Sequence, residues 1–160
     1  MGCQDISGFD GLPGMNPGQD CMACHSVGGQ ASGLQWSAAG TIFPTPYSAA
    51  DDGLPNAEIQ ITDSATPPRA MTLRSNGAGN FYTAEPLTAP LHVAVQFGGQ
   101  RYQMQEAAPV GSCNHCHALI EGTATAVPLP PPYLDAGFYY GIPPTGRLFV
   151  PLTATDGGGS

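Results

Sequence analysis

Two short cysteine motifs constrain this 160-residue chain more than any other feature of its sequence. Each motif has two cysteines separated by two residues and followed directly by a histidine: CMACH at residues 21–25 and CNHCH at residues 113–117. Histidine occurs only four times in the chain, so its placement behind both cysteine pairs is informative. Two copies of the same motif predict that the chain uses the same chemistry at two places.

The C-x-x-C-H pattern is the attachment signature of a haem c. The two thiols add across the two vinyl groups at one edge of the porphyrin, and the two intervening residues set their separation. The histidine that follows then lies under the iron as its proximal axial ligand. We therefore expect two haems c, held by thioethers from Cys21, Cys24, Cys113 and Cys116, with His25 and His117 as proximal ligands.

Two other interpretations use the same cysteines. Four thiolates can hold one structural zinc ion, but zinc ribbons separate their cysteine pairs by about 15–20 residues, whereas residues 25–112 lie between the pairs here. A disulfide within each pair would suggest thioredoxin-like redox chemistry, but the flanking β-α-β pattern of such proteins is missing. Both interpretations remain open as alternatives.

The two remaining histidines, His92 and His115, match in number the two distal iron positions, which predicts bis-histidine ligation. His92 falls on the polar face of the alternating segment 91–97, where a strand histidine is otherwise simply solvated. His115 lies inside the second motif, from where it can reach the iron of the first haem or of a neighbouring subunit. Met104 is the rival distal ligand, and Met/His ligation would raise the reduction potential.

The central part of the chain reads as short strands separated by turn signals rich in Gly, Pro, Asn and Asp. Six strands are expected, near residues 35–43, 57–63, 69–75, 79–84, 91–98 and 100–106. Their spacing predicts a mainly-β fold with an antiparallel β-sandwich and little helix. If the strands form a meander, an even count returns the chain to its starting end, so that both motifs lie at the same end.

We therefore expect three parts. Residues 1–34 form a leader and the first haem motif, residues 35–106 form the β-sandwich, and residues 107–160 carry the second motif. The last part includes a short helix near 114–121, a Pro- and aromatic-rich strap over 127–146 that covers a haem face, and a C-terminal strand.

One stretch of the sandwich resembles a known domain. The segment GLPNAEIQITD at 53–63 and the later segment SNGAGNFY at 75–82 resemble the carboxypeptidase regulatory-like, or transthyretin-like, domain, with Asn76 where Asp is commoner. The whole arrangement is similar to dihaem lipoproteins of environmental bacteria, in which such a domain lies between two C-x-x-C-H motifs. This resemblance implies an Ig/transthyretin-like sandwich with a binding or spacer role and without peptidase activity.

Charge excludes several classes of partner. Asp, Glu, Lys and Arg make up only 10% of the chain, against a usual share of about 25%. The formal net charge is -8, and all four basic residues are arginines. Nucleic acids and anionic membrane surfaces are bound through clusters of Lys and Arg that this chain lacks. No apolar run is long enough to cross a bilayer.

The predicted cofactor also indicates a compartment. Haem c is attached outside the cytoplasm, so we expect an extracytoplasmic protein at the cell surface or in the extracellular space of a bacterium. Gly2-Cys3 resembles the end of a bacterial lipobox, which predicts a lipid anchor at Cys3. The alternative for Cys3 is a free or intermolecularly bridged thiol.

These observations predict an electron-transfer protein and not an enzyme, because two six-coordinate irons leave no open position for a substrate. Its partners would be redox proteins or extracellular acceptors, and the acidic surface suits a basic partner. If His92 or His115 binds the iron of a neighbouring subunit, the chain assembles into an oligomer or a filament. The alternatives are a dihaem peroxidase, or a β-sandwich binding module with a structural metal.

Overall fold

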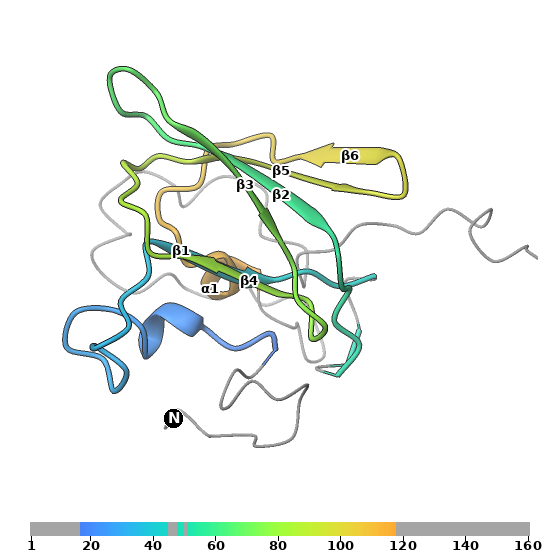
Figure 1. The fold of residues 1–160 in the computed structure, drawn as a ribbon, viewed down its shortest axis with the longest axis horizontal. Helices are drawn as coiled ribbons and strands as arrows, with labels where there is room; N and C mark the ends of the chain where they lie inside the picture. The colour runs from blue at the N-terminus through green and yellow to red at the C-terminus, as the bar shows by residue number, and fades with distance from the viewer. Residues whose placement is uncertain (1–16, 45–47, 50, 118–160) are drawn as a thin grey trace, which may run out of the picture.

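The computed structural model describes residues 17–44, 48–49 and 51–117 (Figure 1). The predicted leader, the Cys3 anchor, the strap over 127–146 and the C-terminal strand lie outside the described residues. The described elements, in chain order, are η1 (Cys21–Ala23), β1 (Ala38–Thr41), β2 (Glu58–Thr62), β3 (Ala70–Arg74), β4 (Asn80–Thr83), β5 (His92–Phe97), β6 (Gln100–Gln103) and α1 (Cys113–Cys116). In the described part of the chain, no helix has the length and apolar content that crossing a membrane requires.

The six strands form two antiparallel sheets, so the mainly-β prediction is confirmed. One sheet has two strands in the order β1-β4, and the other has four strands in the order β3-β2-β5-β6. The six strands expected between residues 35 and 106 are all present, although each is shorter than expected, the first and the last most of all. The expected meander is wrong, because β1 pairs with β4 and β2 lies between β3 and β5.

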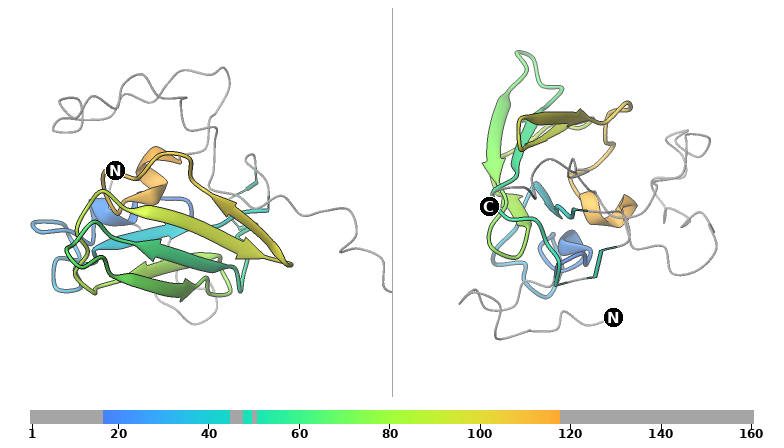
Figure 2. Two further views of the ribbon diagram at one scale, coloured as in Figure 1. Left: turned by 90° about the horizontal axis from the view of Figure 1, so that it is seen from above. Right: turned by 90° about the vertical axis from the view of Figure 1, so that its right-hand side faces the viewer.

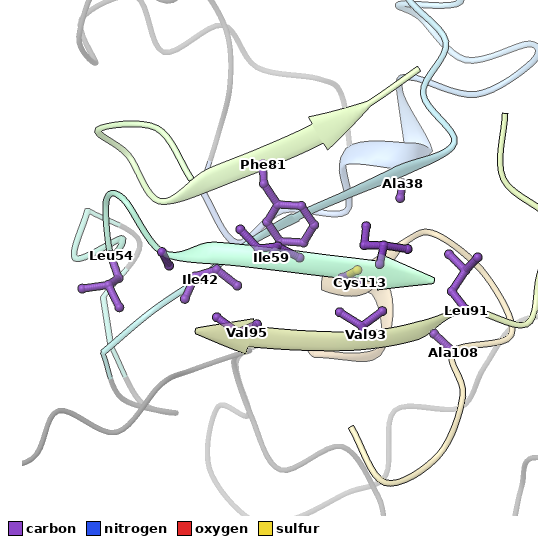
Figure 3. Packing of buried hydrophobic residues seen from close by; sticks show 12 residues of the cluster. Ala38, Ile42, Leu54, Ile59, Phe81, Leu91, Val93, Val95, Ala108 and Cys113 are labelled. Atoms are coloured by element: carbon purple, nitrogen blue, oxygen red, sulfur yellow. The ribbon is translucent and has the colours of Figure 1, made fainter. Parts of the chain in front are cut away.

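The hydrophobic core lies between the two sheets (Figure 3). In β2 and β5, apolar side chains alternate with polar ones, so Ile59 and Val95 face inward and are 0% and 4% exposed. Phe81 from β4 meets them from the opposite sheet. Full burial of one side chain of this size stabilises a fold by about 1.5–3 kcal/mol.

A buried carboxylate clamps one end of the four-stranded sheet. The Asp63 side chain accepts hydrogen bonds from the backbone amides of Arg69 at 2.7 Å and Thr88 at 3.1 Å, and it also binds the Arg69 guanidinium at 2.8 Å. The hydrogen bond from the Arg69 amide is the main reason why the pKa of Asp63 falls to about 2. This clamp ties the turn between β2 and β3 to the segment that leads into β5.

The chain reaches the second motif along the free edge of β1. Ala39 donates its backbone N–H to the Gly111 carbonyl at 2.9 Å and forms a parallel bridge with Ser112. A side chain at Gly111 would overlap the Ser37 carbonyl, so this close backbone approach requires glycine. The residues that follow, Cys113–Cys116, are therefore held against the two-stranded sheet.

Candidate functional site

The first motif folds as a tight helical turn. Asp20 caps η1, because its side chain accepts hydrogen bonds from the amides of Met22 at 3.1 Å and Ala23 at 3.3 Å. The His25 amide then donates to the Cys21 carbonyl at 3.0 Å. A helical turn places residues three apart on the same side, which is the arrangement that two thioethers to one porphyrin edge need.

The His25 ring is fixed by neighbours that the sequence did not reveal. Its Nδ1 lies 2.8 Å from the Leu34 carbonyl oxygen. A carbonyl can only accept, so Nδ1 carries the hydrogen and Nε2 carries the lone pair. The ring stacks on Trp36 with centroids 3.5 Å apart, and Trp36 stacks on Tyr82 of β4 with centroids 4.4 Å apart. Metal-binding histidines commonly donate their second ring nitrogen to a carbonyl in this way.

The second motif forms a similar turn in a different setting. In α1, the His117 amide donates to the Cys113 carbonyl at 2.9 Å, which matches the bond in the first motif. The predicted helix near 114–121 begins one residue earlier, and its residues beyond 117 lie outside the described part. Cys113 is 9% exposed and belongs to the hydrophobic core, whereas Cys116 and His117 are half-buried.

The fold brings the two motifs side by side (Figure 2, right-hand view). Asp20 lies 2.9 Å from Nδ1 of His115, and it accepts a hydrogen bond from the Ser112 hydroxyl. The Asn114 amide donates to the Gln19 carbonyl at 2.8 Å. The two motifs therefore lie next to each other, as expected, and they do so because both pack beside β1 and not because the strands form a meander.

Asn114 connects the second motif to β1 and to the first motif at once. Its side chain is buried, accepts from the Thr41 amide at 2.9 Å and donates to the Thr41 hydroxyl at 3.0 Å. The same amide group lies 3.8 Å from the sulfur of Cys21. This role could not be predicted, because an asparagine between two cysteines has no local sequence pattern that indicates its partners.

Three of the motif cysteines have weakly acidic thiols in this fold. Burial raises the pKa of Cys21 to about 11, and the charge of Asp20 adds to the effect. Burial raises the pKa of Cys113 to about 12, and it also raises the pKa of Cys116. All three are free thiols, whereas Cys24 is disulfide-bonded. The attacking form of cysteine is the thiolate, so these sulfurs are poor nucleophiles near neutral pH.

The two distal-ligand candidates outside the motifs lie elsewhere in the fold. His92 is exposed at the start of β5, on the face opposite Val93, so it projects from the outer face of the four-stranded sheet. Both motifs instead pack beside β1 of the other sheet. Met104 packs against the hydrophobic core. Of the sequence candidates, the fold brings only His115 next to the other motif.

The spacing of the donors in each motif fits a haem c, and in the first motif this fit requires that the disulfide of Cys24 is opened. Both turns present two cysteines one helical turn apart, followed by a histidine whose amide closes the turn. Within residues 17–44, 48–49 and 51–117, no group of three or more His, Cys, Asp or Glu side chains is arranged around a single metal ion. A haem needs no such group, because the porphyrin supplies four of the six iron ligands. Comparison with protein-family models, curated proteins and solved structures found no match to this chain.

Proposed function

We propose that this chain is a dihaem c-type cytochrome that transfers electrons outside the cytoplasm. The observation that carries the proposal is the pair of C-x-x-C-H motifs, which fold as matching helical turns and lie side by side. The residues that would hold the two haems are Cys21, Cys24, Cys113 and Cys116 as thioethers and His25 and His117 as proximal ligands.

Ligation by two histidines favours electron transfer over catalysis. A haem iron supplies a one-electron couple, and a protein tunes it through the axial ligands, burial and hydrogen bonds. His25 is already oriented by the Leu34 carbonyl. His115, held next to the first motif by Asp20, is the proposed distal ligand of the first haem. Irons with both axial positions filled have no site for a substrate.

The outward position of His92 supports a role between subunits. It projects from the outer face of the four-stranded sheet, away from the side on which the core and β1 lie. From there it can approach a haem of another copy. As the distal ligand of that copy's second haem iron, His92 would join the copies into an oligomer or a filament. The net charge of -8 favours a basic redox partner. A cell-surface location and a lipid anchor at Cys3 are part of the same proposal.

The burial of Cys113 implies an order of assembly. Its thiol lies in the core, so haem attachment at Cys113 would require the motif to leave its seat on β1. The disulfide of Cys24 must also be reduced before that sulfur can form a thioether. We therefore expect haem attachment to precede the docking of the motifs.

The test is a count of covalently bound haems. The chain is exported from bacteria that carry the haem c attachment machinery, and its intact mass and pyridine haemochrome spectrum are measured. Two haems are expected. The double variant C21A/C24A and the double variant C113A/C116A should each retain one haem, and the matched control Cys3→Ala should retain both.

Two results would contradict the proposal. If the chain carries no covalent haem, the result favours a zinc-binding or disulfide role for the cysteines. A chain with two haems of which one is high-spin and turns over hydrogen peroxide would favour the peroxidase alternative, because that chemistry needs an open iron position.

A further inference from the structure

Asp20 occupies the junction between the two motifs, and its two carboxylate oxygens have separate partners. Oδ1 accepts hydrogen bonds from the amides of Met22 and Ala23 and from the Ser112 hydroxyl at 2.5 Å. Oδ2 lies 2.9 Å from Nδ1 of His115. The side chain of Asp20 is 32% exposed and that of His115 is 19% exposed, so water screens this pair only in part.

Capping alone does not explain this arrangement. A helical cap needs one acceptor oxygen, and Oδ1 supplies it. The second oxygen of Asp20 is directed instead at a residue of the other motif, 95 positions further along the chain. Because a carboxylate oxygen accepts, Nδ1 of His115 carries a hydrogen and Nε2 is the nitrogen with the ligand lone pair. A carboxylate in this position fixes the ring and raises the basicity of a metal-binding histidine.

We propose that Asp20 is a positioning residue that orients His115 toward the iron of the first haem and lowers the midpoint potential of that haem. This inference rests on the proposed function. The ferric iron carries one more positive charge than the ferrous iron, so a nearby carboxylate stabilises the ferric state. The same oxygen holds the His115 ring in one orientation. Asp20 thereby links the coordination of one haem to the motif that holds the other.

The test compares Asp20→Asn with Asp51→Asn in the full dihaem protein. Asparagine caps helices about as well as aspartate, so Asp20→Asn keeps the turn and removes the charge. Asp51 is an exposed acid in the loop after β1 and serves as the matched control. We expect Asp20→Asn to raise the midpoint potential of one haem by about 59 mV. For a one-electron couple, this shift corresponds to a tenfold change in the ferric-to-ferrous ratio. The low-spin electron paramagnetic resonance signal of that haem should shift as well.

A second variant separates positioning from a general charge effect. His115→Ala should convert one haem to a high-spin spectrum, and Asp20→Asn should shift the potential less in the His115→Ala background than in the native chain. Equal shifts in both backgrounds would overturn the link to His115. Two low-spin haems in His115→Ala would overturn it as well.

The proposed function and the role of Asp20 can fail separately. If the native chain carries no haem, the proposed function fails and the role of Asp20 fails with it. If two haems are attached and Asp20→Asn behaves like Asp51→Asn in potential and spectrum, only the role of Asp20 is overturned.

Discussion

The two motifs share a five-residue pattern and the same closing hydrogen bond, yet they are anchored in different ways. Cys113 of the second motif packs in the hydrophobic core, and the residues just before it bridge to β1. The residues of η1 in the first motif are half-buried or exposed, and this motif is held by side-chain hydrogen bonds and by the stack of His25 on Trp36. The second motif is therefore part of the sandwich, whereas the first is docked onto it.

The largest effect should come from the glycine that seats the second motif. Gly111→Ala puts a side chain against the Ser37 carbonyl and should cost about 3 kcal/mol of unfolding free energy, at the upper end for overpacking. Gly29→Ala overlaps the Cys24 carbonyl and should open the loop of the first motif while the sheets stay folded. Chemical denaturation and amide hydrogen exchange measure the two effects.

Gly33→Ala is the matched control for both glycine variants, because a side chain there meets no atom within 4 Å. If Gly29→Ala lowers the unfolding free energy as much as Gly111→Ala, the first motif is as integral to the sandwich as the second.

Asn114→Ala tests the side-chain contacts that join the second motif to β1 and to the first motif. It leaves the buried Thr41 amide and the Gln19 carbonyl without their partner, at a cost of about 2 kcal/mol. The measurement is the denaturation midpoint. Gln105→Ala, at an exposed side-chain amide, should leave it unchanged. A cost no larger than that of Gln105→Ala would show that Asn114 does not hold the motifs together.

Acid should weaken the four-stranded sheet by protonating the Asp63 clamp. The pKa of Asp63 is about 2 in the fold against an ordinary value of 3.8, so its stabilisation is present above about pH 4 and is lost as the pH falls toward 2. Unfolding free energies measured between pH 6 and pH 2 test this expectation. This range covers about two pH units on either side of the ordinary aspartate pKa. Asp63→Asn should flatten the curve, and a curve of unchanged slope would contradict the role of the clamp.

The two cysteines of the second motif should differ in reactivity when the chain is produced without haem. Cys113 is buried with a pKa near 12, whereas Cys116 is half-buried. We expect iodoacetamide to label Cys116 at least about tenfold faster, since access and the thiolate fraction set the rate. Peptide mass spectrometry over a time course measures both rates. In denaturant the rates should converge, and equal rates under native conditions would argue against the seating of Cys113.

The smallest effect should come from the aromatic stack beside the first motif. Trp36→Leu removes the contacts with His25 and Tyr82 and should cost about 1 kcal/mol, the size of an aromatic pair contribution. Hydrogen exchange near residues 25–36 reports the local loosening. Tyr82→Phe keeps the ring and should show no change. Loosening that spreads to β2 and β5 would mean that the stack supports the whole fold.

Much of the local structure could be predicted because it depends on neighbours in sequence. The alternation of Ile59 and Ile61 with polar residues predicted a half-buried strand, and the observed strand β2 has that pattern. The spacing of each C-x-x-C-H motif predicted nearby sulfurs, and a helical turn provides that arrangement. The sheet order could not be predicted in this way, because short strands with similar alternation can pair in several orders.

The two cysteine motifs and the six strands follow from local sequence, since each depends on residues within a few positions of one another, and the scarcity of charge follows from composition. The contact of Asp20 with His115, the link from Asn114 to β1 and to the first motif, and the outward position of His92 depend on the tertiary fold. These contacts join segments separated by 73 to 95 positions. The pairing of β1 with β4 and the common core bring such segments together, because burying both sheet faces against each other favours one arrangement of the chain.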